Sequence, residues 1–400
     1  MTEKVLIVGG GIGGLAGALA CSRAGLEVDL FERAAEFSEV GAGIQLGPNV
    51  TALLHGWGLK DALANVAAFP GRLQVRSATS GGELGVLTLG AVAQARYGFP
   101  YATIHRADLH TLLRTALQLQ TGVRLYAGSA VAGFVAHDDD VTLHMADGRA
   151  AHGDLLLGAD GLWSAVRQQL LNDGKPRATG HLAYRALVPQ SSLPERLRSQ
   201  QVTAWLGPRL HVVQYPVRRG DWLNVVAIVH GRTVGDAENW DHSANGAELQ
   251  RHLAATCAPL QNLIGAIEQW RLWPLSIRSP MRGAHEQAQG RVALLGDAAH
   301  PMLPYLAQGA GMAIEDAAEL GRVLARAGAT LPEQPRDLPA LLSLYARRRW
   351  QRNARVQARA IRNGNIFHAT GPLRWGRDAA MKLLGESLLD LPWLYGGAQS

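Results

Sequence analysis

Cysteine, long apolar runs and internal repeats are scarce or absent in this chain of 400 residues. Only Cys21 and Cys257 are present, which excludes a disulfide framework and a thiolate-rich metal site and favours a reducing compartment. Glycine or a charged residue interrupts every apolar stretch within about a dozen positions, too soon for a membrane span. The apolar start at residues 5–20 is too rich in glycine for a signal peptide. We therefore expect a cytoplasmic protein.

Charge is also modest: charged residues make up 18% of the chain and apolar residues 47%, the balance of a globular protein rather than a disordered one. The net charge is +6. A positive field attracts nucleic acid, but it serves anionic cofactors and carboxylated substrates equally well. We expect a small anionic partner and no nucleic acid.

A glycine-rich loop is the first motif that carries chemistry. An apolar run at residues 5–8 leads into Gly9, Gly11 and Gly14, spaced as G-x-G-x-x-G, and helical periodicity follows at once. Glycine lets the backbone approach a pyrophosphate, and the helix N-terminus offers it unpaired N–H groups. Glu32 ends the next apolar run, where a carboxylate accepts from a ribose hydroxyl. A purely structural loop is the alternative, but this context predicts a dinucleotide site.

Two later loops also follow buried strands. One, at residues 158–161, contains Asp160, and by itself it is equally well an ordinary turn before a helix. The other, at residues 296–301, contains Asp297, whose carboxylate can accept from sugar or ribityl hydroxyls. A helix predicted to begin at Gly309 points its positive end toward an anion such as a reduced flavin.

Taken in order, these motifs resemble those of the group A flavoprotein aromatic monooxygenases, which share the fold of 4-hydroxybenzoate hydroxylase. The likeness covers nearly the whole chain and is greatest to 3-hydroxybenzoate 6-hydroxylases, salicylate hydroxylases and 6-hydroxynicotinate 3-monooxygenases. It implies a single-component enzyme that binds FAD, meets NADH or NADPH transiently, and oxygenates a small phenol with O2, commonly as a homodimer. The segments that carry it are 31–33, 41–49, 105–109, 183–185, 211–216, 296–317 and 393–396.

The fold that we predict is α/β: an FAD-binding Rossmann-like domain with an inserted, mostly antiparallel sheet and a C-terminal helical region. Strand-like segments at 181–188, 202–206, 210–217 and 222–230 mark the insertion. The predicted boundaries are 1–174 for the first part of the FAD-binding domain, 175–285 for the substrate domain, 286–330 for the second part of the FAD-binding domain and 331–400 for the helical region.

The resemblance also implies which residues hold the cofactor. The glycine loop takes the pyrophosphate, Glu32 the ribose and Asp297 the sugar-alcohol chain, while the loop from Pro304 onward flanks the isoalloxazine. In this family the motif of Asp160 serves the nicotinamide cofactor as well. The full set is Gly9, Gly11, Ile12, Gly13, Gly14, Glu32, Arg33, Arg106, Val131, Asp160, Asp297, Pro304, Gly309, Ala310, Gly311 and Met312.

For the substrate, residues 211–216 predict a strand on which His211 and Tyr215 share one face. Their backbones then lie about 13 Å apart. In similar hydroxylases the matching His and Tyr orient and deprotonate the phenol, and histidine titrates near neutral pH. Ordinary packing of both side chains is the alternative. Gln45, Pro304 and Tyr305 complete the predicted substrate set.

Two departures leave the substrate open between hydroxybenzoates and hydroxypyridine carboxylates. Pro304 stands where 3-hydroxybenzoate 6-hydroxylases carry Gln, and Tyr305 stands where 6-hydroxynicotinate enzymes carry His. A flavin halogenase is disfavoured because Trp270 and Trp273 do not form W-x-W-x-I-P. A non-oxygenating FAD oxidase or sensor stays as the alternative function.

Two histidine- and arginine-bearing segments have simpler interpretations. His300 has no Cys or second His at ligand spacing, so we expect no metal site. Six arginines between residues 347 and 359 predict a helix face that is solvated or ion-paired.

Overall fold

A computed structural model describes the chain except for residues 1, 39–40, 232–241, 245, 331–335 and 398–400. The chain divides into two compact units, each made of three segments. The first unit contains residues 1–40, 107–177 and 277–360, and the second contains residues 41–106, 178–276 and 361–400. Within the described ranges no helix combines the length and the apolar character needed to cross a membrane.

The first unit is built on a six-stranded sheet in the order β18-β19-β11-β1-β2-β7. All neighbours are parallel except the edge pair β18–β19. Parallel strands buried on both faces read as continuous apolar runs, as in the fully buried triplet Leu155–Leu157. The strands are β1 (Lys4–Val8), β2 (Glu27–Phe31), β7 (Val123–Tyr126), β11 (Leu155–Gly158), β18 (Ala288–Gln289) and β19 (Val292–Leu294).

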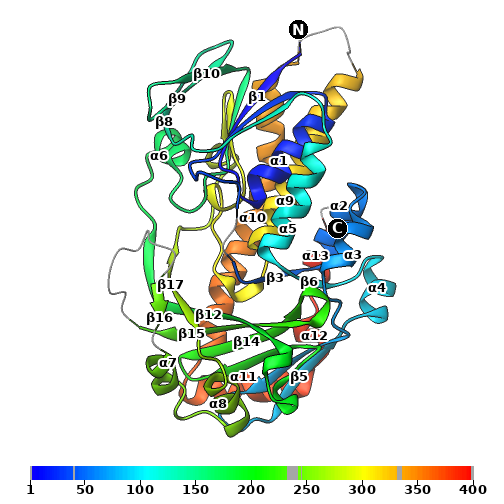
Figure 1. The fold of residues 1–400 in the computed structure, drawn as a ribbon, viewed down its shortest axis with the longest axis vertical. Coiled ribbons are helices and arrows are strands. Elements are labelled where there is room, and N and C mark those ends of the chain that lie inside the picture. Colours follow the sequence, from blue (N-terminus) through cyan, green and yellow to red (C-terminus); the bar gives the residue numbers. More distant parts are fainter. Residues whose placement is uncertain (1, 39–40, 232–241, 245, 331–335, 398–400) are drawn as a thin grey trace. The chain divides into compact units, whose positions relative to one another are not determined.

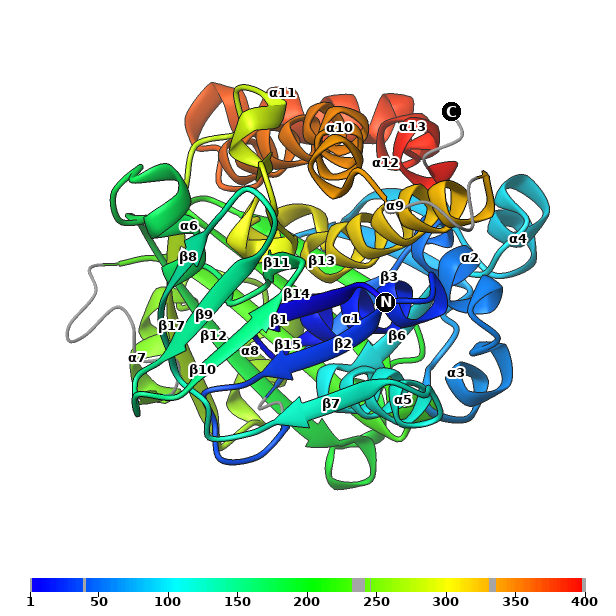
Figure 2. The same ribbon diagram turned by 90° about the horizontal axis from the view of Figure 1, so that it is seen from above.

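Helices cover one face of this sheet and a small antiparallel sheet covers the other. The helices α9, α1 and α5 lie side by side (Figure 2), and Gly321 of α9 lets the helix approach Ala20 of α1 closely. On the opposite face Leu143 and Met145 pack against Leu6 and Leu156. The elements are α1 (Ile12–Arg23), α5 (Arg106–Gln118), α6 (Ala165–Leu171), α9 (Gly309–Thr330), α10 (Leu338–Phe367), β8 (Val131–Ala136), β9 (Val141–Met145) and β10 (Ala150–Gly153).

The second unit is built on an eight-stranded sheet in the order β16-β17-β12-β15-β14-β13-β4-β5 (Figure 1). Strands β12, β15, β14 and β13 pair antiparallel, and β4 joins β13 in parallel. A separate pair, β3 (Gly43–Leu46) and β6 (Ala102–His105), is antiparallel. The large sheet consists of β4 (Arg72–Ser77), β5 (Glu83–Thr88), β12 (Arg177–Pro189), β13 (Val202–Gly207), β14 (Leu210–Val217), β15 (Trp222–His230), β16 (His242–Ala244) and β17 (Trp270–Ile277).

The two faces of this sheet bury different partners. Val212 and Val225 pack with Leu249 of α7 and Leu263 of α8 in one core, and Tyr215 and Val217 belong to another. Alternation along each strand therefore separates a plain apolar face from a face that carries polar side chains. The helices of this unit are α2 (Pro48–Gly56), α3 (Lys60–Val66), α4 (Ala91–Tyr97), α7 (Gly246–His252), α8 (Ala258–Gly265), α11 (Gly371–Leu384), α12 (Glu386–Leu389) and α13 (Pro392–Tyr395).

The predicted fold class is confirmed, and the four predicted strands of the insertion are β12, β13, β14 and β15. The observed division differs from the predicted boundaries at two places. Residues 41–106 belong to the second unit because β4 and β5 extend its sheet beyond β13. The helical region also does not form a body of its own, since α10 begins in the first unit and ends in the second.

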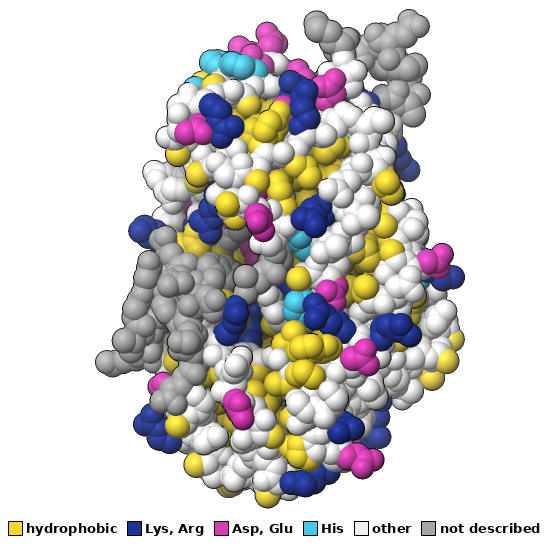
Figure 3. Space-filling view, viewed as in Figure 1, with side chains coloured by type: hydrophobic (Ala, Val, Ile, Leu, Met, Phe, Trp, Pro, Cys, Tyr) yellow, Lys and Arg dark blue, Asp and Glu magenta, His cyan; other side chains and the backbone are white. Residues whose placement is uncertain are grey.

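The basic side chains form no single stripe on the face drawn in Figure 3. There, Lys and Arg are scattered, and several lie beside Asp or Glu.

Candidate active site

The glycine loop of the first unit has room for backbone only. Gly9 adopts φ +103°, and a Cβ there would lie 2.4 Å from the Ala159 carbonyl oxygen. A Cβ on Gly14 would lie 1.8 Å from the Gly9 oxygen, so no side chain fits at that position. By contrast, a Cβ on Gly13 would make an ordinary 3.5 Å contact with Ala313. The loop therefore brings the N-terminus of α1, beginning at Ile12, directly against the strand end.

Glu32 shapes this loop besides being the candidate ribose ligand. Its two carboxylate oxygens accept from the backbone N–H groups of Gly10 at 2.6 Å and Ala34 at 2.8 Å. Each oxygen keeps a second lone pair for a hydroxyl group. His110 of α5, buried, lies with its Nε2 2.8 Å from the Gly10 carbonyl oxygen and holds the loop from the other side. Sequence reasoning missed His110 because nothing in its own segment marks it.

The carboxylate of Asp160 accepts hydrogen bonds from the residues at the start of α6. Its carboxylate accepts from Ser164 Oγ at 2.5 Å and from the backbone N–H groups of Ala165 and Val166. Burial raises the pKa of Asp160, and these hydrogen bonds lower it by less. Arg167, 2% exposed, donates from Nη1 to the carbonyl oxygens of residues 298 and 299. The start of α6, held by Asp160, is thus bonded to the loop that carries Asp297.

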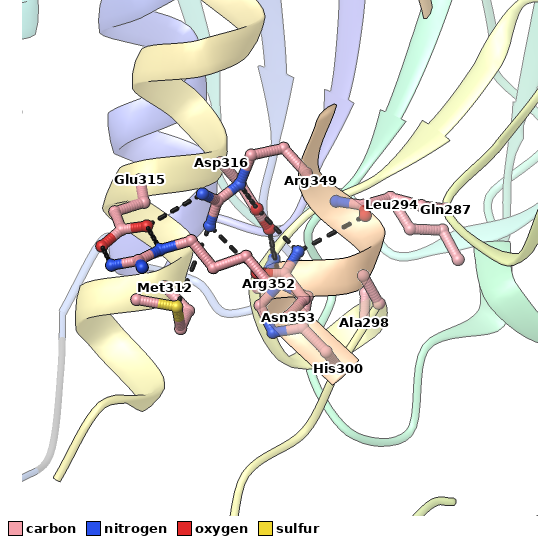
Figure 4. A network of polar contacts seen from close by, with 12 residues as sticks. Gln287, Leu294, Ala298, His300, Met312, Glu315, Asp316, Arg349, Arg352 and Asn353 are labelled. Atoms are coloured by element: carbon pink, nitrogen blue, oxygen red, sulfur yellow. Dashed lines mark hydrogen bonds and ion pairs between the residues drawn. The ribbon is translucent and has the colours of Figure 1, made fainter. Parts of the chain in front are cut away.

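A buried polar network fixes the loop that carries Asp297 (Figure 4). Asp316 of α9 accepts from the Gly296 backbone N–H at 3.2 Å, and its Oδ2 lies 2.5 Å from His300 Nε2. Arg349 of α10, 1% exposed, donates from Nε to Asp316 and from Nη1 to Glu315, both at 2.8 Å. Burial raises the pKa of Asp316, but His300 and Arg349 outweigh burial and bring it below its usual range. His300 is therefore a partner of Asp316, and the basic helix face is ion-paired here.

The predicted isoalloxazine loop occupies the turn before α9. Pro304 and Tyr305 lie in a 3-10 turn that ends at Ala307, which has a left-handed φ of +52°. Tyr305 is 3% exposed, and burial raises its pKa. Residues 309–312 form the first turn of α9, so their backbone N–H groups point out of the helix N-terminus.

These features fit an FAD. A Cβ on Gly9 or Gly14 would overlap the backbone of Ala159 or of Gly9, so glycine in this cradle keeps the turn tight and α1 close to the strand end, as a pyrophosphate site requires, and Glu32 stands one strand away. Of the remaining predicted cofactor residues, Arg33 is exposed just after β2, and Val131 begins β8. Arg106, at the start of α5 in the second unit, lies over Gly41, where a Cβ would come within 2.7 Å of it.

In the second unit, His211 and Tyr215 lie on the same face of β14, as predicted. His211 is 2% exposed, and its Nδ1 lies 2.8 Å from His368 Nε2. Burial, with a smaller effect of His181, lowers the pKa of His211 to about 3. Tyr215 is 4% exposed and donates to the Gly43 carbonyl oxygen at 2.7 Å.

Tyr215 and Gln45 belong to one group of polar contacts around Gly43. A Cβ on Gly43 would lie 2.5 Å from the Tyr215 ring, and the Gly43 N–H donates to Asn224 Oδ1 at 2.6 Å. Gln45 Oε1 accepts from Tyr101 Oη at 2.6 Å. Burial raises the pKa of Tyr215, while Arg185 and Gln45 lower it by less. Of the predicted substrate set, Gln45 and Tyr215 therefore lie together, and His211 lies farther along the strand.

Arg185 of β12 is the residue to which sequence reasoning assigned no role. It aligns with Val226, which aligns in turn with Val213, and all three are partly exposed. Its guanidinium lies 4.9 Å from the Trp273 ring, and no carboxylate among the described residues pairs with it. Burial lowers the pKa of Arg185 to about 10, while Tyr215 raises it by less and Arg106 lowers it slightly further. A cation so placed is suited to an anionic ligand.

Comparison with known proteins identifies the family of this chain. A family described as an FAD binding domain matches residues 2–360. A 3-hydroxybenzoate 6-hydroxylase of Polaromonas naphthalenivorans (strain CJ2) is 38% identical over 396 residues, covering 98% of this chain and 95% of that protein. Klebsiella pneumoniae HpxO complexed with FAD and uric acid has a TM-score of 0.83 at 27% identity, covering 97% of this chain and 94% of its own. A salicylate hydroxylase substrate complex has a TM-score of 0.81 at 28% identity, covering 98% and 95%. The chain therefore belongs to the FAD-binding-domain family and, within it, to the group A FAD-dependent aromatic monooxygenases.

Proposed function

We propose that this monooxygenase hydroxylates a small phenolic carboxylic acid of the hydroxybenzoate type. Bound FAD, reduced by NADH or NADPH, supplies oxygen activated from O2. The observation that carries the substrate class is Arg185, a cation that is enclosed at Nε and has no carboxylate partner among the described residues. A relative that is 38% identical is named for a substrate with both a hydroxyl and a carboxylate, which supports the same class.

In this proposal the residues of the second unit divide the work along one sheet face. Arg185 donates a charge-assisted hydrogen bond to the substrate carboxylate, and Tyr215 and Gln45 orient the substrate ring. His211 receives the phenol hydroxyl: when its Nδ1–H donates to His368 Nε2, its own Nε2 is an acceptor. A hydrogen bond from the phenol O–H to this nitrogen raises electron density at the ortho and para carbons, which promotes their oxygenation.

A panel of aromatic acids tests the substrate class. The FAD-loaded enzyme would be given 3-hydroxybenzoate, salicylate and 6-hydroxynicotinate, with benzoate and phenol as controls that lack one group each. We expect the first group to stimulate nicotinamide oxidation and to yield a product with one new ring hydroxyl, heavier by one oxygen atom where the carboxylate is retained and lighter where the new hydroxyl replaces it. Peroxide without hydroxylated product would instead make the protein an oxidase, and binding without nicotinamide oxidation would make it a sensor.

The role of His211 has its own test. We expect His211→Ala to keep FAD, to lose roughly 10²-fold or more of its hydroxylation rate, and to release more peroxide per nicotinamide oxidised. His252→Ala, an exposed histidine of α7, is the matched control. Unchanged coupling in the His211 variant would remove this residue from the reaction.

We also propose that the enzyme works in the cytoplasm as a homodimer. The cytoplasm supplies reduced nicotinamide cofactor and keeps thiols such as Cys21 and Cys257 reduced, which fits their free state. Sedimentation of the FAD-loaded protein tests the assembly, and a single species with the mass of one chain would overturn it.

A further inference from the structure

Four histidines gather at one end of the sheet face that carries His211. His181 of β12 pairs across the sheet with His230 of β15, so both side chains lie on the same face. His211 pairs with Ile228, two positions before His230, and therefore shares that face. His368 follows the last residue of α10 and reaches the three strand histidines from the helix side.

Three of these rings converge on one point. The ring centroid of His181 lies 4.4 Å from that of His230 and 5.0 Å from that of His368, and the last two centroids are also 5.0 Å apart. One ring nitrogen of each lies within 4.8 Å of the others, and His230 Nε2 is 3.0 Å from His368 Nδ1. Imidazole nitrogens about 2.0–2.1 Å from a shared metal ion would stand roughly 3.0–3.4 Å from one another. The pair His230 and His368 already has this spacing, and the widest separation allowed by the observed limit exceeds it by about 1.4 Å.

His211 occupies the position of an outer hydrogen-bond partner. A metal-bound histidine normally donates its second ring N–H to a nearby acceptor, which fixes its tautomer. If His368 binds a metal through Nδ1, its Nε2–H donates to His211 Nδ1 across the observed 2.8 Å contact.

The cluster is partly open to solvent: His368 is 6% exposed, and His181 is partly exposed. Arg209 and Arg377 lie close enough to oppose a positive ion, although Arg377 is paired with Asp378 at 2.7 Å. His230 is exposed, which gives an ion access from solvent.

We propose that His181, His230 and His368 form a binding site for a divalent transition-metal ion of the Zn²⁺, Co²⁺ or Ni²⁺ class, with His211 as the hydrogen-bonded outer residue. Three imidazoles without a carboxylate select this class over Mg²⁺ and Ca²⁺, which prefer oxygen ligands. Occupancy would reverse the hydrogen bond between His211 and His368 and leave the hydrogen on His211 Nε2. An occupied site and an accepting His211 would therefore exclude one another, a consequence that rests on the proposed function.

Metal titration tests the site without any activity. FAD-loaded protein free of a histidine tag and stripped with a chelator would be titrated with Co²⁺ and followed by visible absorption, then with Zn²⁺ as competitor. We expect one ion per chain, no displacement by Mg²⁺, and at least a tenfold loss of affinity in His230→Ala. His252→Ala, with equal net charge change, would bind like wild type, and thermal melts would verify that both variants are folded.

Absence of Co²⁺ binding, or equal binding by the His230 and His252 variants, would overturn the proposal. Hydroxylation assays then separate it from the proposed function. We expect Zn²⁺ to slow wild type at the concentration that fills the site and to leave His230→Ala unaffected. Saturating Zn²⁺ with full hydroxylation would retain the metal site and instead refute the accepting role of His211.

Discussion

Arg349, buried in the first unit, and Arg185, partly buried in the second, differ in how their charges are balanced. Arg349 is surrounded by Glu315, Asp316 and Asn353, and its charge is cancelled within hydrogen-bond distance. Arg185 meets an aromatic ring and has no carboxylate partner in the described part of the chain. In the first unit, which we call the frame, the charge of Arg349 is therefore balanced by its own neighbours. Arg185 instead leaves a cation of the second unit available to a ligand.

We expect the largest loss of stability from a substitution in the glycine loop of the frame. We expect Gly14→Ala to cost at least about 3 kcal/mol of stability and to yield colourless protein, because its Cβ would overlap the Gly9 oxygen. Gly13→Ala is the control, since its Cβ would meet Ala313 at an ordinary distance and the fold should survive. Melting temperature and flavin absorbance measure both. A yellow, fully stable Gly14 variant would contradict the geometry of the cradle.

We expect the second-largest loss of stability from Arg349→Met. Removing this guanidinium leaves buried carboxylates uncompensated, so we expect a loss of about 3–5 kcal/mol in the free energy of unfolding. Arg347→Met, an exposed change in the same helix, should stay within about 0.5 kcal/mol of wild type. Adding Asp316→Asn to Arg349→Met should restore part of the loss. Denaturant unfolding measures all three, and similar stabilities for the Arg347 and Arg349 variants would contradict the balanced-frame account.

For Arg185→Met we expect almost no loss of stability but a clear loss of substrate binding. Removal of Arg185 takes away a partly buried charge without a carboxylate partner among the described residues and one contact with Trp273, so stability should stay within about 1 kcal/mol of wild type. Binding of 3-hydroxybenzoate should weaken by about 1.5–3 kcal/mol, roughly 10- to 150-fold. Perturbation of the flavin spectrum measures the dissociation constant. Arg72→Met, which removes only a surface ion pair of this unit, should bind as wild type does.

The smallest expected effect is the loss of the stability contribution of Asp316 at acidic pH. The pKa of Asp316 is lower in the folded protein than the unfolded value of about 3.9, so its contribution to stability is present above pH 4. That contribution is lost as the pH falls through the folded pKa, by at most about 1.4 kcal/mol per pH unit. Unfolding free energies of wild type and Asp316→Asn should therefore converge below about pH 4. A gap that widens toward low pH would reverse the assigned direction of the shift.

How far the sequence predicts this protein depends on whether a feature is built from residues that are near or distant in the sequence. Gly9, Gly14 and Glu32 act within one strand–loop–helix–strand unit, so their spacing alone predicts a nucleotide site. The predicted FAD is supported by the family match, and the strands that carry His211 and Tyr215 form as expected.

Contacts between residues far apart in the sequence could not be predicted from it. His181, His230 and His368 come from two strands and the end of a distant helix, so no spacing signals that they meet. Arg185 stood in a recognised motif, but its lack of a carboxylate partner is a property of the packed sheet. Likewise, β4 reaches the second unit only through its parallel pairing with β13, which local periodicity cannot reveal.

The most direct test measures ligand-induced stabilisation in the two arginine variants side by side. Each would be melted as FAD-loaded protein with and without saturating 3-hydroxybenzoate. We predict that Arg349→Met melts lower but keeps the rise in melting temperature on adding ligand, whereas Arg185→Met melts near wild type and loses that rise. The reverse pattern, with the Arg185 variant unstable yet still stabilised by ligand, would contradict the claim that the second unit keeps this charge for its substrate.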